Sequence, residues 1–311
     1  MRPLRVLSIV AAALALVVVV VGAYVRLSDA GLGCPDWPLC YGRPLPADIA
    51  DAGDHARAWK EMGHRYLAGT LGLVIVALAV AAWRTCRSRG LAAALVLLVA
   101  FQAALGKWTV TMLLKPAIVT AHLLGGMATL ALLVWLALSQ WPHAADAGMR
   151  GLRRVAAAAL AALALEIALG GWVSANYAAL ACPDLPLCRG RVVPEMDFAN
   201  AFHVVRELGQ TSEGDLLSHD ALRAIHWTHR LFAPVALAAV LLAALRVWRL
   251  SRGLAITVAA LVALQFALGV LNVALGLPLA LAAAHNAGAA LLLASLVVLN
   301  FFAFRGPRPS W

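Results

Sequence analysis

Long apolar runs separated by short polar segments dominate this chain. Eight of the runs reach the roughly 20 residues that a helix needs to cross the hydrocarbon layer of a bilayer. They cover residues 6–26, 64–83, 91–112, 117–139, 155–176, 223–247, 254–275 and 279–303. The first run follows Arg2 and Arg5, but it is too long for a signal peptide and has no clear cleavage site. We therefore predict eight transmembrane helices and no separate soluble domain.

The composition supports a membrane protein. Of the 311 residues, 63% are hydrophobic and only 13% are charged, whereas soluble domains carry about 25% charged residues. The expected fold class is an all-α polytopic membrane protein, with the lipid bilayer as its surroundings.

The net charge of +10 could suggest a nucleic-acid ligand, but the basic residues follow the predicted topology instead. With the N-terminus inside, the inner segments contain one acid, Asp146, and 13 basic residues. These are Arg2, Arg5, Arg84, Arg87, Arg89, Arg150, Arg153, Arg154, Arg246, Arg249, Arg252, Arg305 and Arg308. This is the positive-inside distribution. It predicts that both termini are cytoplasmic and gives no reason to expect nucleic-acid binding.

Four of the five cysteines fall in predicted outer loops: Cys34, Cys40, Cys182 and Cys188. Paired outer cysteines suit a bacterial plasma membrane that faces an oxidising compartment. Each pair, Cys34–Cys40 and Cys182–Cys188, encloses five residues and can close to disulfide distance. A structural staple, a dithiol electron relay and a zinc site made from all four thiols remain open.

The chain contains an internal repeat. The matching segments are GCPDWPLCYGR at 33–43 with ACPDLPLCRGR at 181–191, HRYLA at 64–68 with HRLFA at 229–233, QAALG at 102–106 with QFALG at 265–269, and AIVTAHLLGG at 117–126 with LALAAAHNAG at 279–288. Each half then has four spans, so the halves are parallel repeats. We predict two tandem four-helix bundles, residues 1–142 and 143–311, with sites between their helices.

Four histidines near the outer helix ends follow this repeat. His64 and His122 in the first half match His229 and His285 in the second, with offsets 229 − 64 = 165 and 285 − 122 = 163. Two opposed imidazoles on different helices can ligate a haem iron from both faces. Hydrogen bonding across a bundle is the alternative. Zinc fits less well, because it takes about four ligands and each half offers only two such histidines.

Basic residues accompany the histidines at the outer side. Arg65 and Arg230 directly follow the first histidine of each pair. Arg26 and Lys107 occur in the first half, where the second half has Ser174 and Val270. These four cations are candidates for the propionates of a haem, because an arginine can pair with a carboxylate through two hydrogen bonds. Anchoring at the lipid headgroups is the alternative.

Two carboxylates distinguish the halves. Glu61 shares a helix face with His64, whereas the second half has His226 at that position. A carboxylate beside a haem pocket can transfer protons, which makes Glu61 the catalytic candidate. An ion pair with Lys60 or Arg65 is the alternative. Glu166 lies within a span and is therefore a functional candidate, but its role and that of His226 stay open.

The segments VRLSDAGLGCPDWPLCYG, GHRYLAG, TAHLLGG, GGWVSANYAALAC and IHWTHRLFA together resemble the haem A synthase family over nearly the whole chain. The second cysteine pair resembles that of some bacterial members. The resemblance implies two successive hydroxylations of the C8 methyl of haem O, with loss of water giving the formyl group of haem A. It also implies haem b as a cofactor on His229 and His285, substrate haem between His64 and His122, and Glu61 as the carboxylate needed for chemistry.

The resemblance further implies haem O synthase and cytochrome oxidase assembly factors as partners, in a bacterial inner membrane with the haem sites towards the outer side. A homo-oligomer is left open, as are the electron donor and the oxidant. Two other functions remain: a dihaem b-type electron-transfer protein, in which neither haem is modified, and a haem transporter or chaperone.

Overall fold

A computed structural model describes residues 2–46, 51–141 and 147–304 of the protein. This part of the chain consists of helices and loops, without a β-strand. The helices are α1 (Arg2–Leu27), α2 (Ala52–Arg84), α3 (Arg89–Thr111), α4 (Pro116–Ser139), α5 (Ala147–Arg150), α6 (Arg153–Ala175), α7 (Phe198–Ala201), α8 (His219–Val247), α9 (Arg252–Ala274) and α10 (Leu279–Phe304).

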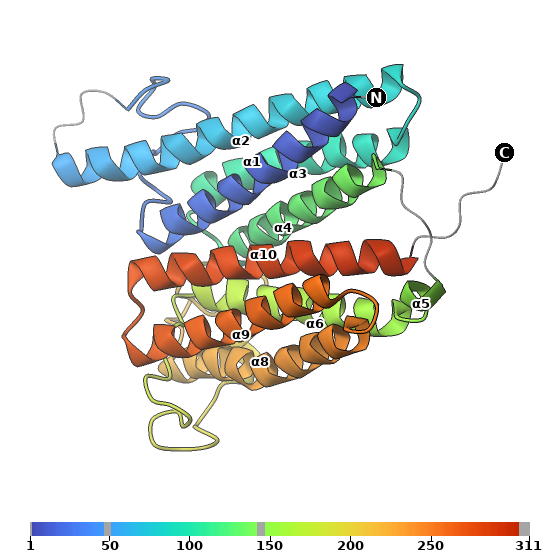
Figure 1. Cartoon of the computed structure of the whole chain (residues 1–311). Coiled ribbons are helices and arrows are strands. Elements are labelled where there is room, and N and C mark those ends of the chain that lie inside the picture. The colour runs from blue at the N-terminus through green and yellow to red at the C-terminus, as the bar shows by residue number, and fades with distance from the viewer. Residues whose placement is uncertain (1, 47–50, 142–146, 305–311) are drawn as a thin grey trace.

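Within the described residues, eight helices are long and apolar enough to cross a membrane. They are α1, α2, α3, α4, α6, α8, α9 and α10, and they lie roughly alongside one another (Figure 1). The predicted all-α class and the eight spans are confirmed. The short helices α5 and α7 lie outside the apolar runs and were not predicted.

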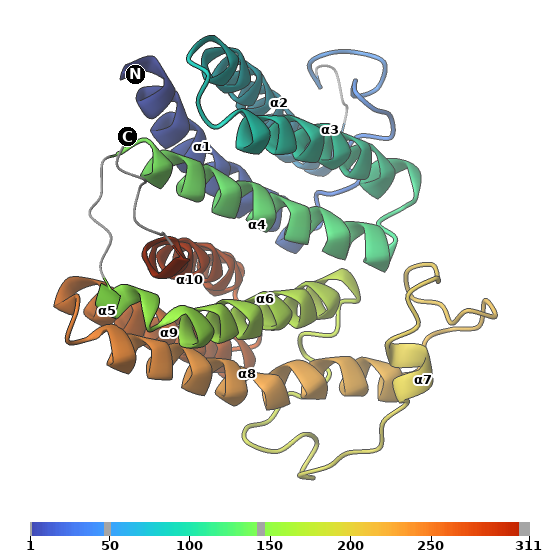
Figure 2. The same cartoon turned by 90° about the vertical axis from the view of Figure 1, so that its right-hand side faces the viewer.

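The helices of each half contact one another in a closed ring. In the first half α1 contacts α2 and α4, and α3 contacts the same two helices. In the second half α6 contacts α8 and α10, and α9 also contacts both. The rings meet where α10 contacts α1 and α4, and where α4 contacts α6 (Figure 2). Because these contacts continue across the boundary, the division into two separate bundles stays a prediction.

Helix α10 is the most enclosed span. In its apolar window 61% of the residues are buried, compared with 17% to 28% in the other seven. Its buried side includes small residues such as Gly288, Ala289 and Ala290, which allow neighbouring helices to come close.

Polar capping residues mark the starts of α2 and α8, which lie before the corresponding apolar runs. Helix α2 begins at Ala52, where the side chain of Asp51 accepts hydrogen bonds from the N–H groups of Gly53 and Asp54. Helix α8 begins at His219 after a similar cap by Ser218. Such caps satisfy backbone donors that the helix itself leaves unpaired. The prediction that the second span starts at His64 was therefore wrong, because a polar capped segment extends the helix beyond the apolar run.

Both outer cysteine pairs form disulfides. The Cα–Cα distances are 4.8 Å for Cys34–Cys40 and 4.6 Å for Cys182–Cys188. The predicted pairing is confirmed. The free cysteine is Cys86, which is exposed between α2 and α3.

An aspartate closes each disulfide loop in the same way. Asp184 accepts hydrogen bonds from the N–H groups of Arg189 and Gly190, at 2.5 and 2.7 Å. Asp36 does the same for Tyr41 and Gly42 in the first half. The Gly190 N–H makes the largest contribution to lowering the pKa of Asp184 below its usual value, because it favours the ionised carboxylate. Both loops are therefore ordered by the same local chemistry.

The first disulfide loop rests directly on the backbone of α2. A methyl group added to Gly33 would lie 2.6 Å from the carbonyl carbon of Arg57 and 2.7 Å from the nitrogen of Ala58. We expect Gly33→Ala to lower the free energy of unfolding by about 1–3 kcal/mol, the usual range for overpacking. Thermal denaturation of the purified protein in detergent measures this effect.

The control is Gly69→Ala on α2, the helix that the loop contacts, because nothing lies within 4 Å of a methyl added at Gly69. Alanine is the better helix former by about 0.5–1 kcal/mol, so this variant should be as stable as the wild type or more stable. Equal melting temperatures for Gly33→Ala and the wild type would contradict the close contact.

Candidate functional site

The four candidate histidines lie on four spans. His64 is on α2, His122 on α4, His229 on α8 and His285 on α10, each partly buried. α2 and α4 lie opposite each other in the ring of helices of the first half, and α8 and α10 lie opposite each other in the second. The structure therefore brings together the two members of each pair that the repeat predicted.

Each of these imidazoles packs against a glycine of a neighbouring helix. A methyl group added at the glycine would lie close to Cε1 of the ring in every case. The contacts are Gly22 with His64 at 2.8 Å, Gly106 with His122 at 3.4 Å, Gly170 with His229 at 3.2 Å, and Gly269 with His285 at 3.2 Å. We call these four glycines the glycine seats. Sequence reasoning missed them, although each recurs at a matching position of the repeat.

The ring nitrogens of the four histidines are little used within the protein. In the described part of the chain, all four Nδ1 atoms are buried without a hydrogen-bond partner. Buried polar atoms are normally paired, so the rings are available to a further group. No cluster of three or more His, Cys, Asp or Glu side chains suited to a metal occurs among the described residues. Paired imidazoles suit a haem, whose macrocycle supplies the other iron ligands, better than a bare zinc ion.

Two glutamines missed by sequence reasoning share the layer of the histidines. Gln265 packs against Gly288, one turn beyond His285, and Gln102 packs against Gly125 in the first half. The side-chain nitrogen of Gln265 lies 3.3 Å from Nε2 of His285. An iron ligated through that Nε2 therefore requires Gln265 to turn away.

Glu61 holds the first disulfide loop on α2. Its side chain is about 5% exposed. One oxygen accepts the N–H of Cys34 at 2.9 Å, and the other lies 2.5 Å from Nη2 of Arg65. The structure therefore contains the ion pair with Arg65 that was the alternative reading of this carboxylate, while its catalytic role stays a prediction.

His226 anchors the second loop in a corresponding way. Its Nδ1 accepts the N–H of Cys182 at 3.2 Å, and the residue is 3% exposed. Glu61 and His226 therefore do the same structural work on the two disulfide loops, despite their different charge. The repeat marked them as equivalent positions, but only the fold shows what they share.

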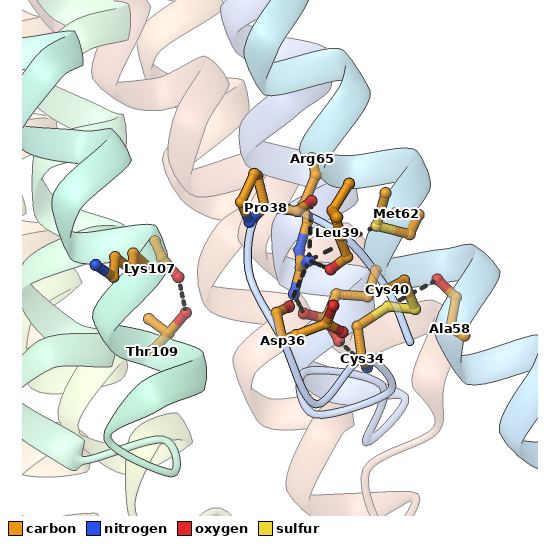
Figure 3. Close-up of polar contacts among 12 residues, drawn as sticks. Cys34, Asp36, Pro38, Leu39, Cys40, Ala58, Met62, Arg65, Lys107 and Thr109 are labelled. Atoms are coloured by element: carbon orange, nitrogen blue, oxygen red, sulfur yellow. Dashed lines mark hydrogen bonds and ion pairs between the residues drawn. A yellow bond between two sulfur atoms is a disulfide. The ribbon is translucent and has the colours of Figure 1, made fainter. Parts of the chain in front are cut away.

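The two arginines at matching positions of the repeat, Arg65 and Arg230, also bind the loops. Arg65 donates through Nη1 to the carbonyl oxygens of Asp36 at 2.9 Å and Leu39 at 2.7 Å, as Figure 3 shows. Arg230 donates to the carbonyl oxygens of Cys182 at 3.3 Å and Leu187 at 3.1 Å. Each arginine links its loop to the helix that carries a candidate histidine. Their role in holding haem propionates stays a prediction.

The other two propionate candidates lie apart from these loop contacts. Arg26, near the end of α1, donates to the carbonyl oxygen of Ser174 at 2.9 Å and stacks on Tyr177, with 3.9 Å between its Cζ and the ring centroid. It therefore links the two halves. Lys107 is exposed on α3, away from the contacts of Arg65 (Figure 3).

The fold and this arrangement define a polytopic membrane protein with paired histidines between its helices. Residues 5–297 match the family model COX15-CtaA, described as cytochrome oxidase assembly protein, and the chain belongs to this family. It is 41% identical over 309 residues to a protein of Shewanella oneidensis named "Heme A synthase", covering 92% of each chain. A protein of the same name from Caulobacter vibrioides is 32% identical over 348 residues, covering 99% of this chain and 97% of the relative. The resemblance seen in the motifs is confirmed.

The tightest glycine seat gives a direct test of the histidine site. In Gly22→Ala, the new methyl would lie 2.8 Å from Cε1 of His64, so the imidazole must move. We expect a loss of about tenfold or more in haem affinity at the first site, since a displacement of this kind disturbs iron ligation. Optical titration with haem of a protein carrying His229→Ala and His285→Ala measures that site alone.

Gly106→Ala provides the matched comparison, because its methyl would lie at an ordinary contact distance of 3.4 Å from His122. It should bind haem nearly as well as its parent. Equal affinities for both alanine variants would show that the seat of His64 does not control the site.

Proposed function

We propose that this protein is a haem A synthase, an oxidoreductase that converts the C8 methyl of haem O into the formyl group of haem A for cytochrome oxidase. The observation that carries the proposal is the family match over residues 5–297, with relatives named for this activity. The paired histidines support it, because they suit the substrate and a second haem.

In this proposal the halves divide the work. His64 and His122 hold the substrate haem O, and His229 and His285 hold haem b. Bound haem b supplies a one-electron redox centre. The chain orients both groups through imidazoles that the glycine seats keep in position. Each of the four rings has a nitrogen without a hydrogen bond among the described residues, which supports this use.

We assign to Glu61 a proton transfer late in the reaction. When the methyl carbon carries two hydroxyl groups, forming the aldehyde requires a proton to leave one oxygen while the other departs as water. Glu61 lies one turn from His64, so its carboxylate can accept and deliver this proton. Arg65 orients the carboxylate through the contact at Oε1.

The proposal includes a location and partners. The chain resides in a bacterial inner membrane with both termini in the cytoplasm, and the haem sites lie towards the outer side, where the disulfides form. Haem O synthase supplies the substrate, and oxidase assembly factors receive the product. Self-association stays an open part of the prediction.

Production of haem A tests the function directly. The chain should convert haem O to haem A when it is expressed with haem O synthase in a host that lacks its own haem A synthase. Extracted haems are separated by liquid chromatography and identified by mass. A dihaem electron-transfer protein or a haem carrier would leave only haems B and O, which would exclude the proposed activity.

A pair of matched substitutions separates chemistry from loop anchoring. Glu61→Gln keeps an oxygen that can accept the Cys34 N–H but removes the charge. We expect conversion of haem O to fall by about 10²-fold or more, the usual contribution of a general acid–base group, while haem remains bound. Haem A yield and the optical spectrum of the purified variant measure the two effects.

The control is His226→Gln, which replaces the acceptor for the Cys182 N–H in the second half. It should retain at least about half of the wild-type conversion. If Glu61→Gln also converts haem O normally, Glu61 serves only to anchor the first disulfide loop.

A further inference from the structure

Glu166 places a carboxylate beside a candidate haem ligand. It lies on α6 within a membrane span, and its Oε1 is 3.1 Å from Nδ1 of His229 on α8. Both side chains are largely enclosed, with exposed fractions of 15% for Glu166 and 20% for His229. A carboxylate in a membrane span is costly and calls for a function. Neither the proposed reaction nor the loops use this one.

The 3.1 Å between Nδ1 of His229 and Oε1 of Glu166 is short enough for a hydrogen bond, but the geometry of the two groups does not form one. Nδ1 of His229 and Oε2 of Glu166 have no hydrogen-bond partner among the described residues. A small rotation of the imidazole would direct its Nδ1 proton at Oε1 without moving either helix. Nε2, the other ring nitrogen, would then be free to bind a metal.

Helix α6 supplies both the carboxylate and the seat of this imidazole. Glu166 and Gly170 are four residues apart and so lie on one face of the helix. Gly170 allows the ring of His229 to approach, and Glu166 contacts Nδ1 of that ring. The ring of His229 is therefore held at its Cε1 edge and at Nδ1 by a single helix.

The first half has no such carboxylate. Gly22 corresponds to Gly170 by the offset of the disulfide loops, 170 − 22 = 148 and 182 − 34 = 148. Four residues before Gly22 stands Val18, which packs against the apolar core. Of the two matching seats, only the one for His229 therefore combines a glycine with a charged neighbour.

We propose that Glu166 is a positioning residue whose carboxylate accepts a hydrogen bond from Nδ1–H of His229 and so fixes the tautomer that binds iron through Nε2. This inference rests on the proposed function, which makes His229 a haem ligand. Carboxylates that contact the non-ligating nitrogen of a metal-binding histidine orient the ring and increase its basicity. A more basic imidazole stabilises ferric iron, so the haem of the second half gives up an electron more readily. The first half, with valine, lacks this adjustment.

The midpoint potential of the second haem tests the inference. His64→Ala and His122→Ala are introduced first, so that the redox titration reports only the haem on His229 and His285. In this background Glu166→Gln removes the charge with little change in volume. We expect the ratio of ferric to ferrous haem at a fixed ambient potential to fall about tenfold, equivalent to a rise of about 59 mV for one electron.

Glu166→Val, which copies the first half, should shift the potential in the same direction, and Glu166→Asp should restore part of it. Val18→Ala is the matched control and should leave the second haem unchanged. Unaltered potentials in Glu166→Gln with haem bound would overturn the inference. Glu166→Gln keeps this test decisive if the valine variant does not fold.

Adding His229→Ala separates this inference from the proposed function. This variant should lose the low-spin spectrum of the second haem. If it keeps that spectrum, His229 is not a ligand and the haem assignment itself fails. If the spectrum is lost but Glu166→Gln has a wild-type potential, the assignment stands and only the role of Glu166 is wrong.

Discussion

The close approach of a glycine to each candidate histidine sets the geometry on which the rest of the structure depends. A methyl group facing the ring would come closest at Gly22, 2.8 Å from Cε1 of His64, and would only touch the ring of His122 at Gly106, at 3.4 Å. The seats at Gly22, Gly106, Gly170 and Gly269 provide space for the rings. They let each ring lie close to the backbone of the neighbouring helix. The site is therefore specified as much by the residues without side chains as by the histidines.

The two disulfide loops are held by the same helices that carry His64 and His229. Glu61 and Arg65 on α2 hold the first disulfide loop, and His226 and Arg230 on α8 hold the second. A helix that carries a candidate ligand thus also carries the side chains that hold a disulfide loop. In the membrane, a carboxylate or guanidinium with several partners is far less costly than an unpaired one. This accounts for the charged residues at positions where apolar residues would otherwise be expected.

Much of the fold followed from local patterns in the sequence. Apolar runs predicted the eight spans, and the spacing of Cys34–Cys40 and Cys182–Cys188 predicted both disulfides. The start of α2 at Ala52 was missed, because a polar capped extension has no hydropathy signal. The contact of Glu166 with His229 was also missed, since it joins two helices whose relative rotation depends on packing. The repeat identified equivalent positions such as Glu61 and His226, but it could not show what they contact.

Helix α10 carries His285 and is enclosed by both halves, since it contacts α1 and α4 as well as α6 and α9. A larger share of its surface is therefore buried by protein than in the other seven spans of the described residues. If the halves were separated, the faces that α10 and α4 turn to the other half would be exposed to lipid. The repeated halves therefore depend on each other for a complete set of buried helix faces, with α10 at their junction.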